Sequence, residues 1–109
     1  MNNQNYVIEW APFQLKEGVD EAAFLSASED LQKEFLNLQK GFVKRDLARA
    51  ADGQWADIVF WASHADAEAA VKVAMDYPAC LRYFEMLASA DPDKPELDIL
   101  HLNVVRSYA

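Results

Sequence analysis

An acid and a large aromatic side chain stand four residues apart in an otherwise apolar segment, residues 55–63 (WADIVFWAS). They are Asp57 and Trp61, and side chains at even spacing on a β-strand point to the same side of a sheet. If that side faces a helix layer, Trp61 could stack on a planar ligand; the alternative is that it only fills the core. A buried Asp57 could accept a proton from a phenol or hydroquinone, because burial makes a carboxylate a stronger base. The segment therefore predicts the wall of a ligand pocket.

Two further side chains could take part in proton transfer, Glu9 near the N-terminus and His101 near the C-terminus. Each candidate has a structural alternative. Asp57 could pair with Lys44 or Arg45 on an adjacent strand, Glu9 has a similar alternative, and His101 could be a hydrogen-bonded core or surface residue. If Glu9 and Asp57 were buried close together, one of them would hold a proton at neutral pH. We take Asp57, Glu9 and His101 as the candidate catalytic residues.

Other chemistry is disfavoured by what the sequence lacks. His64 follows a helix-capping serine and is expected to be exposed, and two scattered histidines without Cys or carboxylate partners at ligand spacing predict no metal site. Cys80 is interpreted as a small core residue, with a reactive thiol at a helix start as the alternative. There is no glycine-rich phosphate loop or nucleotide fingerprint, so we expect no cofactor.

Composition limits the partners. The chain has 109 residues, a hydrophobic share of 52% and a net charge of −8, which argues against binding to nucleic acid or to anionic membrane surfaces. The acidity is interpreted as a solubility feature. The polar residues 1–5 do not resemble a signal peptide, no apolar run reaches the length of a membrane span, and one cysteine allows no intrachain disulfide. A cytoplasmic protein is the expectation.

The apolar spacing predicts four strands and two helices. Strands are expected over residues 6–11, with Pro12 at the end, and over 42–48, 55–62 and 97–105. A five-turn helix should begin after Asp20 and end at Gly41, and a second should begin after Ser63 and continue through Leu87. Pro78 should kink or split that second helix at the preceding residue. An Asp-Gly pair at 52–53 predicts a hairpin turn between the second and third strands.

The order β-α-β-β-α-β predicts an α+β ferredoxin-like fold, an antiparallel sheet with two helices on one face. Strands one and three, which carry the fewest charges, would lie in the middle, and the charged second strand would lie at an edge. The third strand is apolar on both faces, so the face without helices is expected to be an interface. We therefore predict a homodimer of one domain, residues 6–108, with residues 1–5 as a polar tail.

The chain resembles the antibiotic biosynthesis monooxygenase-like (ABM-like) family of dimeric α+β barrel proteins. The resemblance rests on the Gly-Phe pair at 41–42, on residues 57–63 (DIVFWAS), on the alanine-rich start of the second helix and on residues 77–86 (YPACLRYFEM). It implies a homodimer with a ligand pocket in each subunit, between helices and sheet. Some members oxygenate polycyclic aromatic hydroquinones with dioxygen and no cofactor, whereas others degrade haem.

The resemblance also assigns expectations to individual residues. In active members a Trp at the end of the third strand lines the pocket, and Trp61 matches it. A polar residue four positions earlier, often Asn, is Asp57 here. Haem-degrading members need a His on the second helix where this chain has Val71, and an Asn on the first strand where it has Glu9 and Trp10. The resemblance therefore disfavours haem degradation.

The cofactor-free oxygenases of the family use a Tyr and an Arg on or near the second helix. Residues in that region of this chain are Tyr77, Arg82 and Tyr83, and Phe84 belongs to the same aromatic cluster. Such a cluster at helical spacing is typical of a core, with a ligand gate as the alternative. The candidate substrate-binding residues are these four together with Trp61 and Trp10, although core or dimer interface is the favoured interpretation of Trp10.

Two functions follow as hypotheses. The first is a cofactor-independent monooxygenase that acts on a small aromatic or quinone-like metabolite in a pocket between helices and sheet. The second is a non-catalytic homodimeric module that binds a ligand or a partner. An unpaired acid or base beside Trp61 in an open pocket favours the enzyme, and a pocket filled by the protein's own side chains favours the module.

Overall fold

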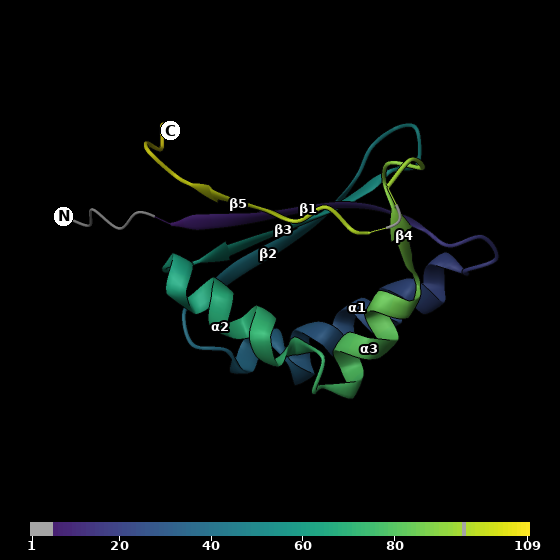
Figure 1. The fold of residues 1–109 in the computed structure, drawn as a ribbon, viewed down its shortest axis with the longest axis horizontal. Helices are drawn as coiled ribbons and strands as arrows, with labels where there is room; N and C mark the ends of the chain where they lie inside the picture. The colour runs from purple at the N-terminus through teal and green to yellow at the C-terminus, as the bar shows by residue number, and fades with distance from the viewer. Residues whose placement is uncertain (1–5, 95) are drawn as a thin grey trace.

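A computed structural model of the chain describes residues 6–94 and 96–109, so the tail predicted for residues 1–5 lies outside the described residues. The described residues form an antiparallel sheet of five strands with three α-helices and a short 3-10 helix (Figure 1). In chain order the elements are β1 (Val7–Leu15), α1 (Glu21–Glu34), η1 (Leu36–Leu38), β2 (Phe42–Arg49), β3 (Trp55–Trp61), α2 (His64–Ala74), α3 (Pro78–Glu85), β4 (Leu87–Ser89) and β5 (Leu100–Asn103).

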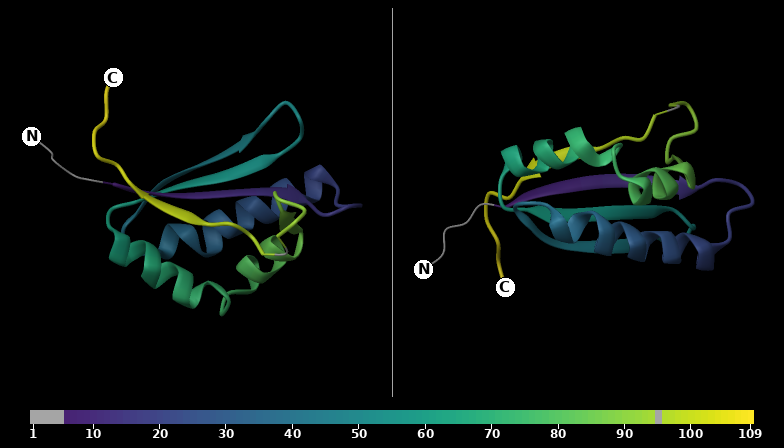
Figure 2. Two further views of the ribbon diagram at one scale, coloured as in Figure 1. Left: turned by 45° about the horizontal axis from the view of Figure 1, so that its top comes forward. Right: turned by 90° about the horizontal axis from the view of Figure 1, so that it is seen from below.

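The four predicted strands have the predicted arrangement in the sheet, and a fifth strand, β4, was not predicted. The strand order is β2-β3-β1-β4, and β5 also pairs with β1, so β1 and β3 lie in the middle and β2 at an edge. Each pairing is antiparallel. Within the described residues, the three α-helices lie on one face of the sheet, and the opposite face carries no helix (Figures 1 and 2). The predicted α+β ferredoxin-like fold is therefore confirmed.

The helix caps follow the sequence. The Asp20 side chain accepts a hydrogen bond from the backbone N–H of Ala23, and the Ser63 side chain accepts one from that of Asp66. The first helix is shorter than predicted, because the chain leaves α-helical geometry at Phe35 and continues as the 3-10 helix η1. Phe35 and Leu36, at the start of this tighter turn, are both buried.

Pro78 splits the second helix as predicted. Helix α2 ends at Ala74, Tyr77 becomes the extended N-cap of α3, and Pro78 occupies the first turn, where its missing N–H breaks no hydrogen bond. Helix α3 packs beside α1 beneath the sheet (Figure 2). The prediction that Leu87 lies on this helix is wrong, because the chain turns at Met86 and Leu87 opens the short strand β4 beside β1.

Two strand boundaries also differ from the prediction. Strand β1 continues through Pro12 to Leu15 instead of ending there. On the side away from β3, β1 pairs with β5 up to Trp10 and with β4 from Phe13, so Pro12 falls in the gap between these partners. The last strand is shorter than residues 97–105, because only 100–103 follow β1 closely enough to pair.

The face of the sheet without helices, called here the outer face, is apolar over β1, β3 and β5 and carries the exposed Lys44 and Asp46 on the edge strand β2. Residues that are direct partners on neighbouring strands share a face. Ile8 pairs with Phe60 and Leu102, and Trp10 pairs with Ile58 and Leu100, which places all six residues on the outer face. The side chains of Trp10, Leu100 and Leu102 are 37%, 53% and 48% exposed. The predicted packing of a second subunit against this face stays a prediction.

Gly41 lies at the junction between η1 and β2, and substituting it tests how closely α2 approaches the backbone there. Its backbone φ is +81°, and a Cβ atom built there would lie 2.6 Å from Cβ of Asp66. Gly53, in the hairpin turn, has a similar φ of +89° but open space around it. We expect Gly53→Ala to cost about 1–2 kcal/mol from the left-handed backbone alone. Gly41→Ala should cost at least about 1 kcal/mol more, because α2 must also move.

Urea denaturation of both variants measures the free energy of unfolding. Equal losses at the two positions would contradict the close approach of α2 to Gly41.

Candidate functional site

A cavity of about 320 Å³ lies between the sheet and the helices. Its walls are mostly apolar and come from almost every element, with Phe13, Val59, Leu31, Phe35, Ala74, Tyr83 and Leu97 among the lining residues. The exposed lining residues are Val71 on α2, its C-cap residue Met75, and Ile99 before β5, so the opening lies between the end of α2 and the approach to β5. Glu9, Arg45, Asp57 and Trp61 bring polar atoms to the wall.

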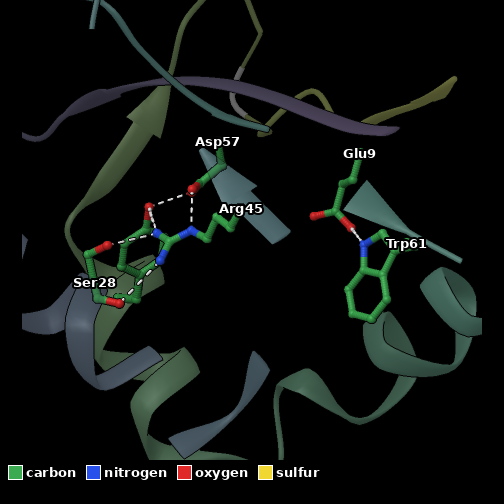
Figure 3. A network of polar contacts seen from close by, with 6 residues as sticks. Glu9, Ser28, Arg45, Asp57 and Trp61 are labelled. Carbon is green, nitrogen blue, oxygen red and sulfur yellow. Dashed lines mark hydrogen bonds and ion pairs between the residues drawn. The ribbon is translucent and has the colours of Figure 1, made fainter. Parts of the chain in front are cut away.

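Asp57 and Trp61 both face the helices, as the strand period predicted, but Asp57 is fully engaged. Its Oδ1 accepts a hydrogen bond of 2.7 Å from Nε of Arg45, and its Oδ2 accepts one from the hydroxyl of Tyr83 (Figure 3). The side chains of Arg45 and Asp57 are only 6% and 10% exposed. The alternative in which Asp57 pairs with Arg45 is therefore the one seen.

Arg45 connects four elements through this network. From β2 its guanidinium reaches the backbone carbonyl and hydroxyl of Ser28 on α1, at 3.2 and 2.8 Å, and the hydroxyl of Tyr83 on α3, at 3.1 Å. Burial by itself would lower the pKa of Arg45, but the charge of Asp57 and the contact with Tyr83 raise it overall. Burial and the neighbouring Asp57 raise the pKa of Tyr83. The network therefore keeps a fixed charge distribution: Arg45 positive, Tyr83 neutral.

Glu9, in contrast, is a carboxylate with one oxygen that accepts no hydrogen bond from the described residues. Its Oε1 accepts a hydrogen bond of 3.2 Å from Nε1 of Trp61, and the other oxygen points toward the side of the cavity where Asp57 lies (Figure 3). Among the described residues, that second oxygen has no hydrogen-bond partner. Burial raises the pKa of Glu9, and the neighbouring His101 and Trp61 only partly oppose this effect. Glu9 is thus a basic carboxylate with one oxygen available to a ligand beside the Trp61 ring.

His101 lies behind Glu9 rather than on the cavity wall. The two residues are direct cross-strand partners of β5 and β1, and Nε2 of His101 lies 3.6 Å from Oε1 of Glu9. His101 therefore reaches a ligand only through Glu9.

Of the other predicted substrate-binding residues, some line the cavity and others lie away from it. Phe84 and Tyr83 line the cavity, although the Tyr83 hydroxyl is engaged by Asp57. Trp10 lies on the outer face, on the side opposite to Glu9. Tyr77 packs its ring against Phe35, with centroids 4.8 Å apart, and does not line the cavity.

Arg82 points away from the cavity and forms an ion pair of 3.5 Å with Asp30 on α1. Cys80 is buried against the cavity, and burial raises the pKa of its thiol to about 11, so the thiol is neutral and a weak nucleophile at physiological pH. Within residues 6–94 and 96–109, no group of three or more His, Cys, Asp or Glu side chains is arranged to hold a metal ion. None of the helices in this described part is long and apolar enough to cross a membrane.

Sequence reasoning offered Arg45 as one of two possible partners of Asp57, but it missed Ser28 and the contacts that Arg45 makes with α1 and α3. Ser28 interrupts the apolar stripe of α1, and a polar residue in such a stripe is a readable signal for a buried partner. Arg45 gives a weaker signal, because an irregularity between Phe42 and Lys44 decides which β2 side chains face the helices.

Substitutions in the network should be strongly coupled. Asp57→Asn or Arg45→Met alone leaves one charge buried without its partner, so each should cost about 3–5 kcal/mol of unfolding free energy. The double variant Arg45→Met/Asp57→Asn should lose much less than the sum, because no unpaired charge is left. Breaking the exposed Arg82–Asp30 pair by Asp30→Asn is the matched control, with an expected loss under about 1 kcal/mol. Urea denaturation measures all four, and additive losses would refute the coupling.

Comparison with solved structures identifies the fold. The chain is 17% identical to a variant of SnoaB, a cofactor-independent oxygenase from Streptomyces nogalater, over 94% of this chain and 95% of that chain, with a TM-score of 0.72. It is 17% identical to a protein assigned to the antibiotic biosynthesis monooxygenases of Bordetella bronchiseptica, over 91% and 96% of the two chains, with a TM-score of 0.71. For Rv0793 from Mycobacterium tuberculosis the identity is 16%, the coverage 95% and 99%, and the TM-score 0.65.

A scan of protein-family models and a search of curated proteins give no match. At these identities the structural likeness concerns the fold alone. The expectation drawn from the resemblance is confirmed at that level: this chain has the α+β fold of the ABM-like proteins.

Proposed function

We propose that this protein binds a small aromatic or quinone-like molecule in the cavity and oxygenates it with dioxygen, without a cofactor. One observation carries the proposal: a mostly apolar cavity has a carboxylate oxygen of Glu9 available beside the ring of Trp61. A volume of about 320 Å³ is at the small end of ligand pockets, which suits a compact ring system. In this proposal the apolar walls pack against the rings of the ligand, and the Glu9 carboxylate accepts a hydrogen bond from one acidic group on it.

Glu9 is the base in this scheme, in preference to Asp57. A general base must have a lone pair within reach of the substrate proton. Both oxygens of Asp57 already accept hydrogen bonds from Arg45 and Tyr83. Glu9 has an available oxygen, and burial raises its pKa toward the range useful for proton abstraction at neutral pH.

The chemistry balances without a further reagent. Glu9 takes a proton from an activated C–H or O–H bond of the substrate, which leaves a carbanion or phenolate. This electron-rich ring reduces dioxygen, and a C–O bond forms at a carbon that still carries a hydrogen; Glu9 returns its proton to the peroxide anion, which gives a hydroperoxide. The remaining C–H bond and the O–O bond then break, the hydrogen leaves as a proton that joins the departing hydroxide as water, and the carbon becomes a carbonyl. The substrate supplies all the electrons that dioxygen accepts.

The electrostatic environment of the cavity favours these reaction steps. The Trp61 N–H holds Oε1 of Glu9 in place, and the low polarity of the walls strengthens interactions with any charge that develops on the ligand. Among the solved structures with this fold, SnoaB is described as a cofactor-independent oxygenase, which is consistent with the proposal.

The second candidate is a homodimeric module that binds a ligand or partner without chemistry. The saturation of Asp57 favours it, because that carboxylate stabilises the fold instead of facing a substrate. In this case Glu9 would only orient a ligand through a hydrogen bond.

Oxygen uptake with dithranol and naphthohydroquinone separates the two candidates. The wild-type protein should accelerate uptake over a protein-free blank, and Glu9→Gln should lower the rate by about 10²–10⁴-fold, the range of general-base catalysis. Glu29→Gln, an exposed substitution of the same type on α1, should leave the rate unchanged. Quenching of tryptophan fluorescence without oxygen uptake, across both probes, would support the binding module instead.

A dimer formed through the outer face is part of both candidates, because this much exposed apolar surface favours a partner. Light scattering should report two chains per particle for the wild-type protein. Leu100→Glu places a charge on the outer face and should give single chains. Leu25→Glu, on the helix side and 41% exposed, is the matched control and should keep the wild-type mass. A wild-type monomer at micromolar concentration would refute the dimer.

A further inference from the structure

We propose that His101 is a positioning residue that shares a proton with Glu9 and keeps that buried carboxylate in its ionised form. This inference rests on the proposed role of Glu9 as the base. It concerns how the base is kept in its reactive form, which the cavity alone does not explain.

The buried position of Glu9 works against its proposed role as a base. Burial raises the pKa of Glu9, so burial favours the protonated acid, which cannot remove a proton from a substrate. Burial also separates Glu9 from bulk water, with 17% of its side chain exposed. A base in such a place needs a neighbour that accepts its proton and stabilises its charge.

His101 has the geometry for that role. It is the cross-strand partner of Glu9, on the helix-facing side of the sheet, and Nε2 lies 3.6 Å from Oε1 of Glu9. Within the described residues this buried nitrogen has no hydrogen-bond partner, which is uncommon for a buried polar atom. A small approach of the two side chains makes a hydrogen bond between them. The glutamic acid then gives its proton to Nε2, leaving Glu9 as carboxylate and His101 as imidazolium.

The other neighbours of Glu9 cannot take this proton. On β3, Trp61 is only a donor, and the charge of Asp57 raises the pKa of Glu9 further. On β2, the guanidinium of Arg45 is committed to Asp57 and Ser28. Tyr83 on α3 donates its hydroxyl proton to Asp57. His101 is therefore the neighbour that opposes the effect of burial on Glu9 and can also change its own charge.

The far side of His101 faces the start of α2. The ring of His64 stands edge-on to the His101 ring, with centroids 5.5 Å apart, and Nε2 of His64 lies 2.6 Å from Oε1 of Glu68. The side chains of His64 and Glu68 are 55% and 51% exposed, so this end of the chain of groups lies in solvent. From the cavity outward the order is Glu9, His101, His64 and water. His101 therefore lies between the buried carboxylate of Glu9 and the exposed side chain of His64.

NMR titration of the free protein tests the shared proton, independently of any activity. The chain has two histidines, so His64→Gln leaves His101 as the source of the remaining imidazole signal. That signal should show an inflection at the pH where the Glu9 carboxyl carbon titrates, and Glu9→Gln should remove it. His101→Gln should move the Glu9 carboxyl midpoint to higher pH, because the attraction of the imidazolium for the carboxylate is lost. A His101 signal indifferent to Glu9→Gln, with a Glu9 midpoint indifferent to His101→Gln, would overturn the proposal.

The pH profile of kcat/KM for dithranol provides the functional readout. In His101→Gln the acid limb should move to higher pH, with the rate recovered at alkaline pH, because Glu9 is then ionised without help. A uniform loss at every pH would indicate a merely structural role and would overturn the proposal. His101→Phe, which keeps ring volume, guards against a packing effect and should give the same displaced limb. If oxygen uptake is absent while the NMR coupling is present, the oxygenase proposal fails and the proton-sharing pair stands.

Discussion

The buried pairing of Arg45 with Asp57 is the interaction on which the interior of this protein depends. It joins β2 to β3, and through Ser28 and Tyr83 it also fixes α1 and α3 beneath the sheet. Charges buried this deeply are tolerated because each has its partner and its hydrogen bonds. Since the helices cannot approach the sheet more closely than this network allows, it also helps to keep the cavity open beside it.

The same network decides which carboxylate is left for chemistry. Two acids lie on the inner faces of the central strands, and they have opposite environments. Asp57 is neutralised by Arg45, whereas Glu9 has only the Trp61 N–H on one oxygen and His101 at a longer distance. A site commonly obtains one structural and one reactive carboxylate by giving two acids different environments, which give the two acids different pKa values. The proposed function follows from this division, and not from the fold, which hosts many chemistries.

Several features could be predicted because they depend on local spacing. The even spacing of Asp57 and Trp61 placed both on one face of β3, and the serine and aspartate caps set where the helices begin. Pro78 ended one helix and started another for the reason that its ring and missing N–H impose. The predictions were wrong where the end of a strand or helix depends on a neighbouring strand. Pro12 is accommodated inside β1 only because β4 and β5 leave a gap there, and Leu87 forms a strand only because β1 offers it an edge.

The sequence by itself determined that β1 and β3 lie in the middle of the sheet, which residues of β3 face inward and that β3 is apolar on both faces, because these follow from side-chain period and from the chemistry of single residues. The tertiary structure alone decided the partners. It brought Arg45 to Asp57, turned Arg82 outward to Asp30, and set His101 behind Glu9. Such pairings depend on strand register and helix placement, which are summed over contacts far apart in the chain. The sequence offered Lys44 and Arg45 as alternatives for Asp57 without deciding between them, so the identity of the free acid became visible only in three dimensions.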